Sequence, residues 1–174
     1  LLTPALWALG RRDVAPGQVV GLSAFCAALG FAFMVLEVVL MQSFTRLVGE
    51  PGWALVAVLA PLLVASGLGS FYLAGRRGLS ARSGAAMAAV ASALVALILP
   101  RVIDAAAPLT FALRLTIGLT VALLVGVPLG VPFAAVLQRL HERELVAWAW
   151  AVNAVAAVAG SLGALVLSSA WGLG

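Results

Sequence analysis

The sequence predicts an all-α, polytopic transmembrane helix bundle with five full spans and a truncated N-terminal helix. Hydrophobic residues make up 64% of the 174 residues and charged residues only 9%. The mean hydropathy is +1.19, far above that of a soluble globular domain, about half of which is apolar. Five apolar stretches are long enough to cross a bilayer, and short Gly-, Pro- and Arg-containing segments separate them. We therefore expect residues 1–174 to form a single membrane domain.

The first segment, LLTPALWALG (residues 1–10), is apolar but shorter than the roughly 20 residues that span a bilayer. No basic region precedes it and Arg-Arg-Asp follows it, which is unlike a signal peptide. We expect it to be the tail of a further helix whose beginning is missing.

The five full spans follow one another with short connections. They are expected at about 19–41, 53–72, 84–102, 109–137 and 145–168. The segments that end the first four are GEPG, GRRGLSAR, IDAAAP and QRLHERE. Pro61 is expected to kink the second span.

The arginines indicate the orientation. All ten basic residues are arginine, and seven of them lie in the connections at 11–13, 76–82 and 139–144. By the positive-inside rule these connections are cytoplasmic, and the C-terminus is then outside. The tryptophans fall near the expected helix ends, at the headgroup level that indoles favour. Because the arginines are scattered, no basic stripe is available to follow a phosphate backbone, so we expect no nucleic-acid partner.

Residues typical of catalytic or metal sites are nearly missing from this sequence. Cys26 is the one cysteine and His141 the one histidine, and His141 lies among charged residues of a connection. The sequence contains no Walker loop, HExxH motif or pair of carboxylates spaced for acid–base catalysis. We expect no cofactor, no metal and no enzymatic activity.

Glu37 and Arg114 are charged residues inside expected spans. Each lies four or five residues from the outer end of its span, and Glu37 is then about 6 to 9 Å deep. A charge inside the membrane costs about 2.5 to 3.5 kcal/mol, so such groups usually pair or line a cavity. We expect a Glu37–Arg114 pair, direct or through water, which either fixes helix register or forms a proton or cation site. Gln42 is rotated about 140° from Glu37 and is expected to be interfacial, on the face of Arg46.

Small residues mark expected helix contacts. In the second span, PLLVASGLGS places Ser66 with Ser70 and Ala65 with Gly69 on a small-residue face. In the fourth, GVPLGVP combines the GxxxG pair Gly126 and Gly130 with two prolines. We expect this segment to be bent or broken, either as architecture or as a binding site of the kind found in transporters.

In the fifth span, Asn153 and Gly160 lie on one stripe. Asn153 is expected to cap or hydrogen-bond a neighbouring helix, worth about 1 kcal/mol, and carbonyls freed by the prolines of the fourth span are one candidate partner.

Three segments together resemble the C-terminal membrane region of bacterial spermidine synthase-like proteins. They are GFAFMVLEVVLMQSFTRLVGEPGWALVAVLAPLLVASGLGS (30–70), PLGVPFAAVLQRL (128–140) and AWAWAVNAVAAVAGSLGA (147–164). The sequence departs from the pattern at Glu50, where relatives have histidine, and at Ala154, where glycine is usual. In that family this region follows an aminopropyltransferase-like domain. The resemblance therefore implies a non-catalytic membrane domain in the bacterial inner membrane.

Two classes of function remain open from the sequence. The leading one is a membrane anchor or structural subunit of a larger complex, whose partners are the lipid bilayer and other membrane subunits or the missing N-terminal part of its own chain. The alternative is a small transporter, or part of one, with its polar site around Glu37, Arg114, Asn153 and the fourth span. A cavity that reaches Glu37 would favour transport, and dry packing around a paired Glu37 would favour a scaffold. An intramembrane enzyme is the least supported.

Overall fold

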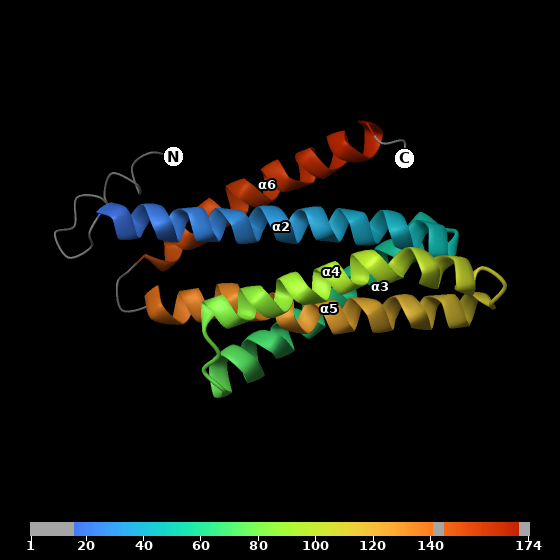
Figure 1. Cartoon of the computed structure of the whole chain (residues 1–174), viewed down its shortest axis with the longest axis horizontal. Coiled ribbons are helices and arrows are strands. Elements are labelled where there is room, and N and C mark those ends of the chain that lie inside the picture. Colours follow the sequence, from blue (N-terminus) through green and yellow to red (C-terminus); the bar gives the residue numbers. More distant parts are fainter. Residues whose placement is uncertain (1–15, 141–144, 171–174) are drawn as a thin grey trace.

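The chain folds as an all-α bundle, as predicted, in a computed structural model that describes residues 16–140 and 145–170 (Figure 1). The elements are α2 (Pro16–Val48), α3 (Pro51–Leu68), the π-helix η1 (Gly69–Arg76), α4 (Ala81–Ala106), α5 (Phe111–Leu140) and α6 (Val146–Ala170). Five helical stretches, with α3 and η1 counted as one, are long and apolar enough to cross a membrane. The predicted tail helix at 1–10 and His141 lie outside the described residues.

The first span is much longer than the sequence predicted. Helix α2 begins at Pro16, a position at which a backbone N–H would have no partner within the helix. The helix continues to Val48 rather than ending near residue 41. Gly49 ends it in the left-handed conformation, with φ 87°. Glu37 is consequently deeper in its helix than expected.

The next two helices begin at side-chain caps. The Glu50 carboxylate accepts hydrogen bonds from the backbone N–H groups of Gly52 and Trp53, at 3.2 and 3.3 Å, and Pro51 follows as the first helical residue. Ser80 caps α4 in the same way by accepting from the N–H of Ser83 at 3.1 Å. Glu50 therefore fixes the start of α3.

The structure differs from the prediction at the end of the second span and at the prolines of the fourth span. The helix of the second span changes to a π-helix at Gly69 and continues to Arg76, four residues beyond the expected end. The fourth span, by contrast, is not broken, because α5 runs continuously through Pro128 and Pro132. Both prolines are buried against neighbouring helices, and such packing is what allows membrane helices to tolerate the missing donors.

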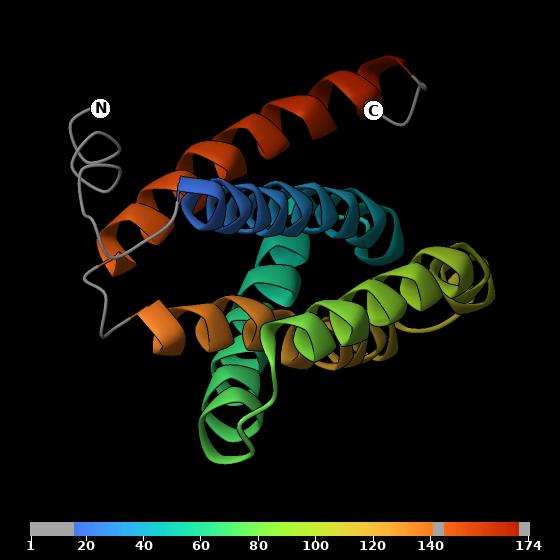
Figure 2. The same cartoon turned by 60° about the vertical axis from the view of Figure 1, so that its left-hand side comes forward.

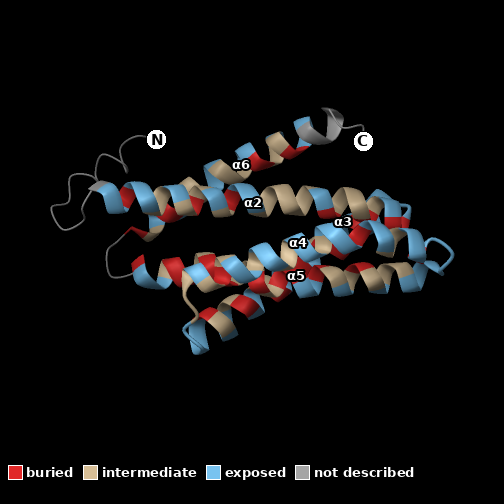
Figure 3. Ribbon diagram, in the orientation of Figure 1, coloured by how far each residue is buried: buried red, intermediate tan, exposed pale blue. Residues whose placement is uncertain are grey.

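Helix α5 lies at the centre of the arrangement and α6 at its edge. Helix α5 packs against α3, η1, α4 and α2, whereas α6 packs along α2 and barely touches α5 (Figures 1 and 2). The main core cluster joins Leu40 and Phe44 of α2 to apolar residues of α3, α4 and α5. Buried residues are concentrated on α3 and α5, and much of α4 and α6 faces outward (Figure 3).

Candidate functional site

Glu37 lies well inside α2, in the helical stretch Gly17–Val48 that is long and apolar enough to cross a membrane. It is eleven residues before Val48, the last residue of the helix, which puts it about 16 Å from that end and within about 8 Å of the helix midpoint. Its side chain is partly buried. Within residues 16–140 and 145–170, no hydrogen bond or ion pair joins Glu37 to another side chain or backbone group.

The face of α2 that carries Glu37 points toward other helices. Gly30 and Phe44 are each seven residues from Glu37 and therefore lie within about 20° of it around the helix. Gly30 packs against Asn153 of α6, and Phe44 is fully buried beside Gly118 of α5. Glu37 is thus between the part of α2 that contacts α6 and the part that contacts α5.

The expected Glu37–Arg114 pair is not formed. Arg114 is near the start of α5, and its Nη1 donates a hydrogen bond of 3.3 Å to the backbone carbonyl of Leu47. Leu47 is ten residues beyond Glu37, so the two charged groups are separated by about 15 Å along α2. The expected matching depth was wrong because α2 continues beyond residue 41, and a bridging water cannot span this gap.

Arg114 instead connects the outer ends of two helices. The carbonyls of the last helical turn have no intrahelical partner and carry partial negative charge, so a guanidinium is favourable there. The Arg114 Nε is buried and has no partner among the described residues. Gln42 lies six residues before the end of α2 and is partly buried, and it makes no hydrogen bond within the described part of the chain.

Asn153 fixes α6 to α2 rather than to α5. Its Nδ2 donates to the carbonyl of Cys26 at 3.1 Å, so the expected bond to a carbonyl freed by the prolines of α5 is not made. The backbone of Asn153 is also so close to Gly30 that a side chain on Gly30 would collide with it. The physical reason is that the close backbone contact of α6 with α2 at Gly30 places the Asn153 amide beside the Cys26 carbonyl.

Two further contacts hold the same pair of helices together. Trp148 Nε1 donates to Ser23 Oγ at 2.8 Å. Gly160 lies against the backbone of Phe31, with no room for a Cβ. The α2–α6 pair is thus joined by small-residue contacts and by two hydrogen bonds between helices.

The small residues of the second and fourth spans meet at the α3–α5 interface. Gly126 lies against Leu62 and Ala65, and Gly130 lies against the backbone carbonyl of Ser66. Gly69 lies in the same way against the carbonyl of Val127. Ser66 Oγ itself bonds within its own helix, to the carbonyl of Leu63 at 3.1 Å. No hydrogen bond of the Ser70 side chain occurs in the described part of the chain.

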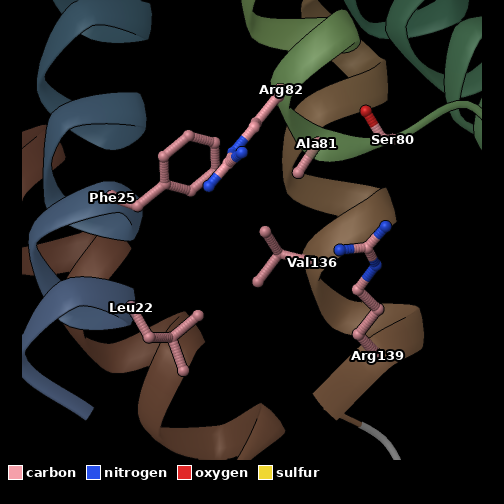
Figure 4. Close-up of a pocket in the computed structure, with 7 residues that line it drawn as sticks. All are labelled: Leu22, Phe25, Ser80, Ala81, Arg82, Val136 and Arg139. Atoms are coloured by element: carbon pink, nitrogen blue, oxygen red, sulfur yellow. The ribbon is translucent and has the colours of Figure 1, made fainter. Parts of the chain in front are cut away.

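Two cavities are present at other places. One, of about 570 Å³, lies between α2, the start of α4 and the end of α5, and it is lined by Leu22, Phe25, Ser80, Ala81, Arg82, Val136 and Arg139 (Figure 4). The other, of about 290 Å³, is an apolar groove between α4 and α5. Neither of them is lined by Glu37.

The sequence did not predict the arginine-lined cavity, although one signal was available. The signal is the position of Arg82 and Arg139, which both lie within two residues of a helix end on the same side of the membrane. Across the described ranges, no group of three or more His, Cys, Asp or Glu side chains is placed to hold a metal.

Comparison of the chain with protein-family models, with curated proteins and with solved structures finds no match.

Proposed function

We propose that this chain is a non-catalytic membrane domain, of the kind that spermidine synthase-like proteins carry, and that it acts as a structural subunit of a larger complex in the bacterial inner membrane. The strongest support is the position of Glu37, which lies far from both ends of α2 and has no partner within the described residues. A membrane helix of another subunit, with a basic or amide side chain at the level of Glu37, supplies the partner.

The arrangement of α6 supports the same proposal. Helix α6 packs along α2 and contacts α5 near its own start, where the Trp150 ring lies 4.8 Å from that of Phe133. An unpaired carboxylate at this depth costs about 2.5 to 3.5 kcal/mol, and a donor from a second subunit offsets that cost. Apolar residues cover the outward faces of α4 and α6, as a chain surrounded by lipid and other membrane helices requires.

Site-specific photocrosslinking in native membranes tests the proposal. A photoreactive amino acid replaces Glu37 in one variant and Leu124, which is 68% exposed on α5, in a control variant. We expect a discrete crosslinked protein from position 37 only, and sequencing of that protein should show a transmembrane helix with a basic or amide residue. Crosslinking to lipid alone at both positions contradicts the subunit role.

A small transporter is the second candidate, and the same unpartnered glutamate favours it. The separation of Arg114 from Glu37 restricts this alternative to Glu37 as a single proton or cation site, because the Asn153 amide also lies away from it, bonded to Cys26 eleven residues before Glu37. Uptake by proteoliposomes distinguishes the two functions. Unaltered uptake and growth after Glu37→Gln, together with a lower melting temperature, rule out the transporter.

A further inference from the structure

The cavity between α2, α4 and α5 brings together two kinds of surface. Figure 4 shows Arg82 extending from α4 toward the Phe25 ring of α2, Leu22 farther along α2, and Arg139 of α5 beyond Val136. Val136 of α5 also points into the space. The result is a space of about 570 Å³ that is lined by two arginines and by apolar side chains.

No carboxylate of the described residues neutralises these arginines. Neither Arg82 nor Arg139 makes an ion pair with another described residue, and both are exposed. Of the described acids, Glu50 and Asp104 lie at the opposite ends of their helices, on the other side of the membrane. Glu37 is fifteen residues beyond Leu22 on α2, or about 22 Å away. Among the described residues, Arg82 and Arg139 therefore bring two positive charges to the cavity without an acidic partner.

The cavity also lies where the membrane surface is expected. Arg82 is the second residue of α4 and Arg139 is the second-last of α5, whereas Leu22 is the seventh of α2. This is the side on which most of the arginines gather, the side that the positive-inside rule makes cytoplasmic. Anionic lipids give cytoplasmic leaflets a negative potential, and basic pockets between membrane helices suit their headgroups.

We propose that this cavity binds the headgroup of an anionic phospholipid. Arg82 and Arg139 hold the phosphate through charge-assisted hydrogen bonds, and the apolar side chains of α2 and α5 contact the first carbons of the acyl chains. A soluble anion needs only the two arginines of the cavity, whereas a phospholipid uses the arginines and the apolar side chains. This site is independent of Glu37 and of the subunit role proposed for it.

Titration of the purified full chain with short-chain phosphatidylglycerol, followed by native mass spectrometry, tests the proposal. Phosphatidylcholine and inorganic phosphate are titrated in parallel. We expect saturable binding of phosphatidylglycerol, weak binding of phosphatidylcholine and no displacement by millimolar phosphate. Charge neutralisation in an Arg82→Gln/Arg139→Gln variant should weaken phosphatidylglycerol binding roughly thirty-fold, because each arginine near an anionic surface contributes several-fold.

The matched control is Arg76→Gln/Arg77→Gln, which removes two arginines from the same side of the membrane, at the end of η1. This variant should bind phosphatidylglycerol within about three-fold of the wild type if the cavity is the site. An equal loss in both double variants means diffuse attraction to a basic surface and overturns the proposal. Displacement by inorganic phosphate, or equal binding of phosphatidylcholine, overturns it as well. Circular dichroism of each variant in phosphatidylcholine verifies that the helices are retained.

Discussion

The substitution Gly130→Ala tests the close contact between α5 and the helix of the second span, where the two backbones nearly touch. A methyl group at this position would fall on the backbone carbonyl of Ser66, which belongs to the neighbouring helix and cannot rotate away. The two helices must therefore move apart, or α5 must rotate. Either movement also disturbs Gly126 and Gly69, which are similarly close to the opposite backbone.

The magnitude follows from two opposing contributions. Forcing a methyl group into a tightly packed contact destabilises by about 1 to 3 kcal/mol. The change from glycine to alanine within a helix stabilises by about 0.5 to 1 kcal/mol. Gly67→Ala is the matched control, because Gly67 lies in α3 and a methyl group added there would meet nothing within 4 Å. The control keeps the helix-propensity gain alone, so the difference between the two variants isolates the packing cost of about 1 to 3 kcal/mol.

Reversible unfolding in mixed micelles, followed by far-UV circular dichroism as denaturing detergent increases, measures both variants. We expect the free energy of unfolding to fall for Gly130→Ala and to stay level or rise for Gly67→Ala. Equal stabilities for the two variants would show that α3 and α5 are not in direct backbone contact at Gly130, and the arrangement of the central helices would then be wrong.

Three smaller effects follow from individual hydrogen bonds, each measured in the same unfolding assay. Asn153→Ala should lower the free energy of unfolding by about 0.6 to 1 kcal/mol through loss of its bond to α2, and Ser161→Ala, which loses only a bond within α6, should have a smaller effect. Glu50→Ala should cost about 1 kcal/mol because it removes the N-terminal cap of α3, and Glu50→Asn should restore most of it. The effects of Trp148→Phe and Ser23→Ala on the free energy of unfolding should be non-additive, since each substitution removes the same hydrogen bond of 2.8 Å.

The sequence was sufficient to predict the number and order of the membrane helices. Hydropathy over some 20 residues is a strong signal because each helix must satisfy its own backbone in lipid. Hydropathy is a weak signal for the residue at which a helix ends. Residues such as Gln42, Ser43 and Arg46 are typical of the end of a span, yet α2 continues through them because the helix ends only at Gly49. A helix can extend beyond the hydrocarbon region, and hydropathy cannot detect that extension.

The error at the end of α2 produced the error at Glu37. An outer end at residue 41 would place Glu37 and Arg114 at the same depth in the membrane, where an ion pair between them would be favourable. The contact between Arg114 and the Leu47 carbonyl joins a side chain to a backbone group, and backbone acceptors have no sequence signature. The same is true of the bond between Asn153 and the Cys26 carbonyl. Small-residue pairs such as Gly126 and Gly130 do have a sequence signature, because only small residues allow two helix backbones to approach closely.

The depth of Glu37 limits how its charge can be accommodated. Glu37 is about 16 Å from the outer end of α2 and about 32 Å from the inner end, and its side chain is too short to reach either end as a long arginine near a helix end does. The carboxylate must then be neutral or meet a donor inside the membrane, and Glu37→Gln separates the two cases. Replacing a neutral acid by an amide keeps size and polarity, so stability and assembly should hardly change. Replacing a paired carboxylate removes a charge-assisted bond and leaves the donor of the partner unpaired, so the complex should dissociate more readily. A loss of crosslinked partner in Glu37→Gln membranes, with the helices intact, is therefore the result that specifically requires a second subunit.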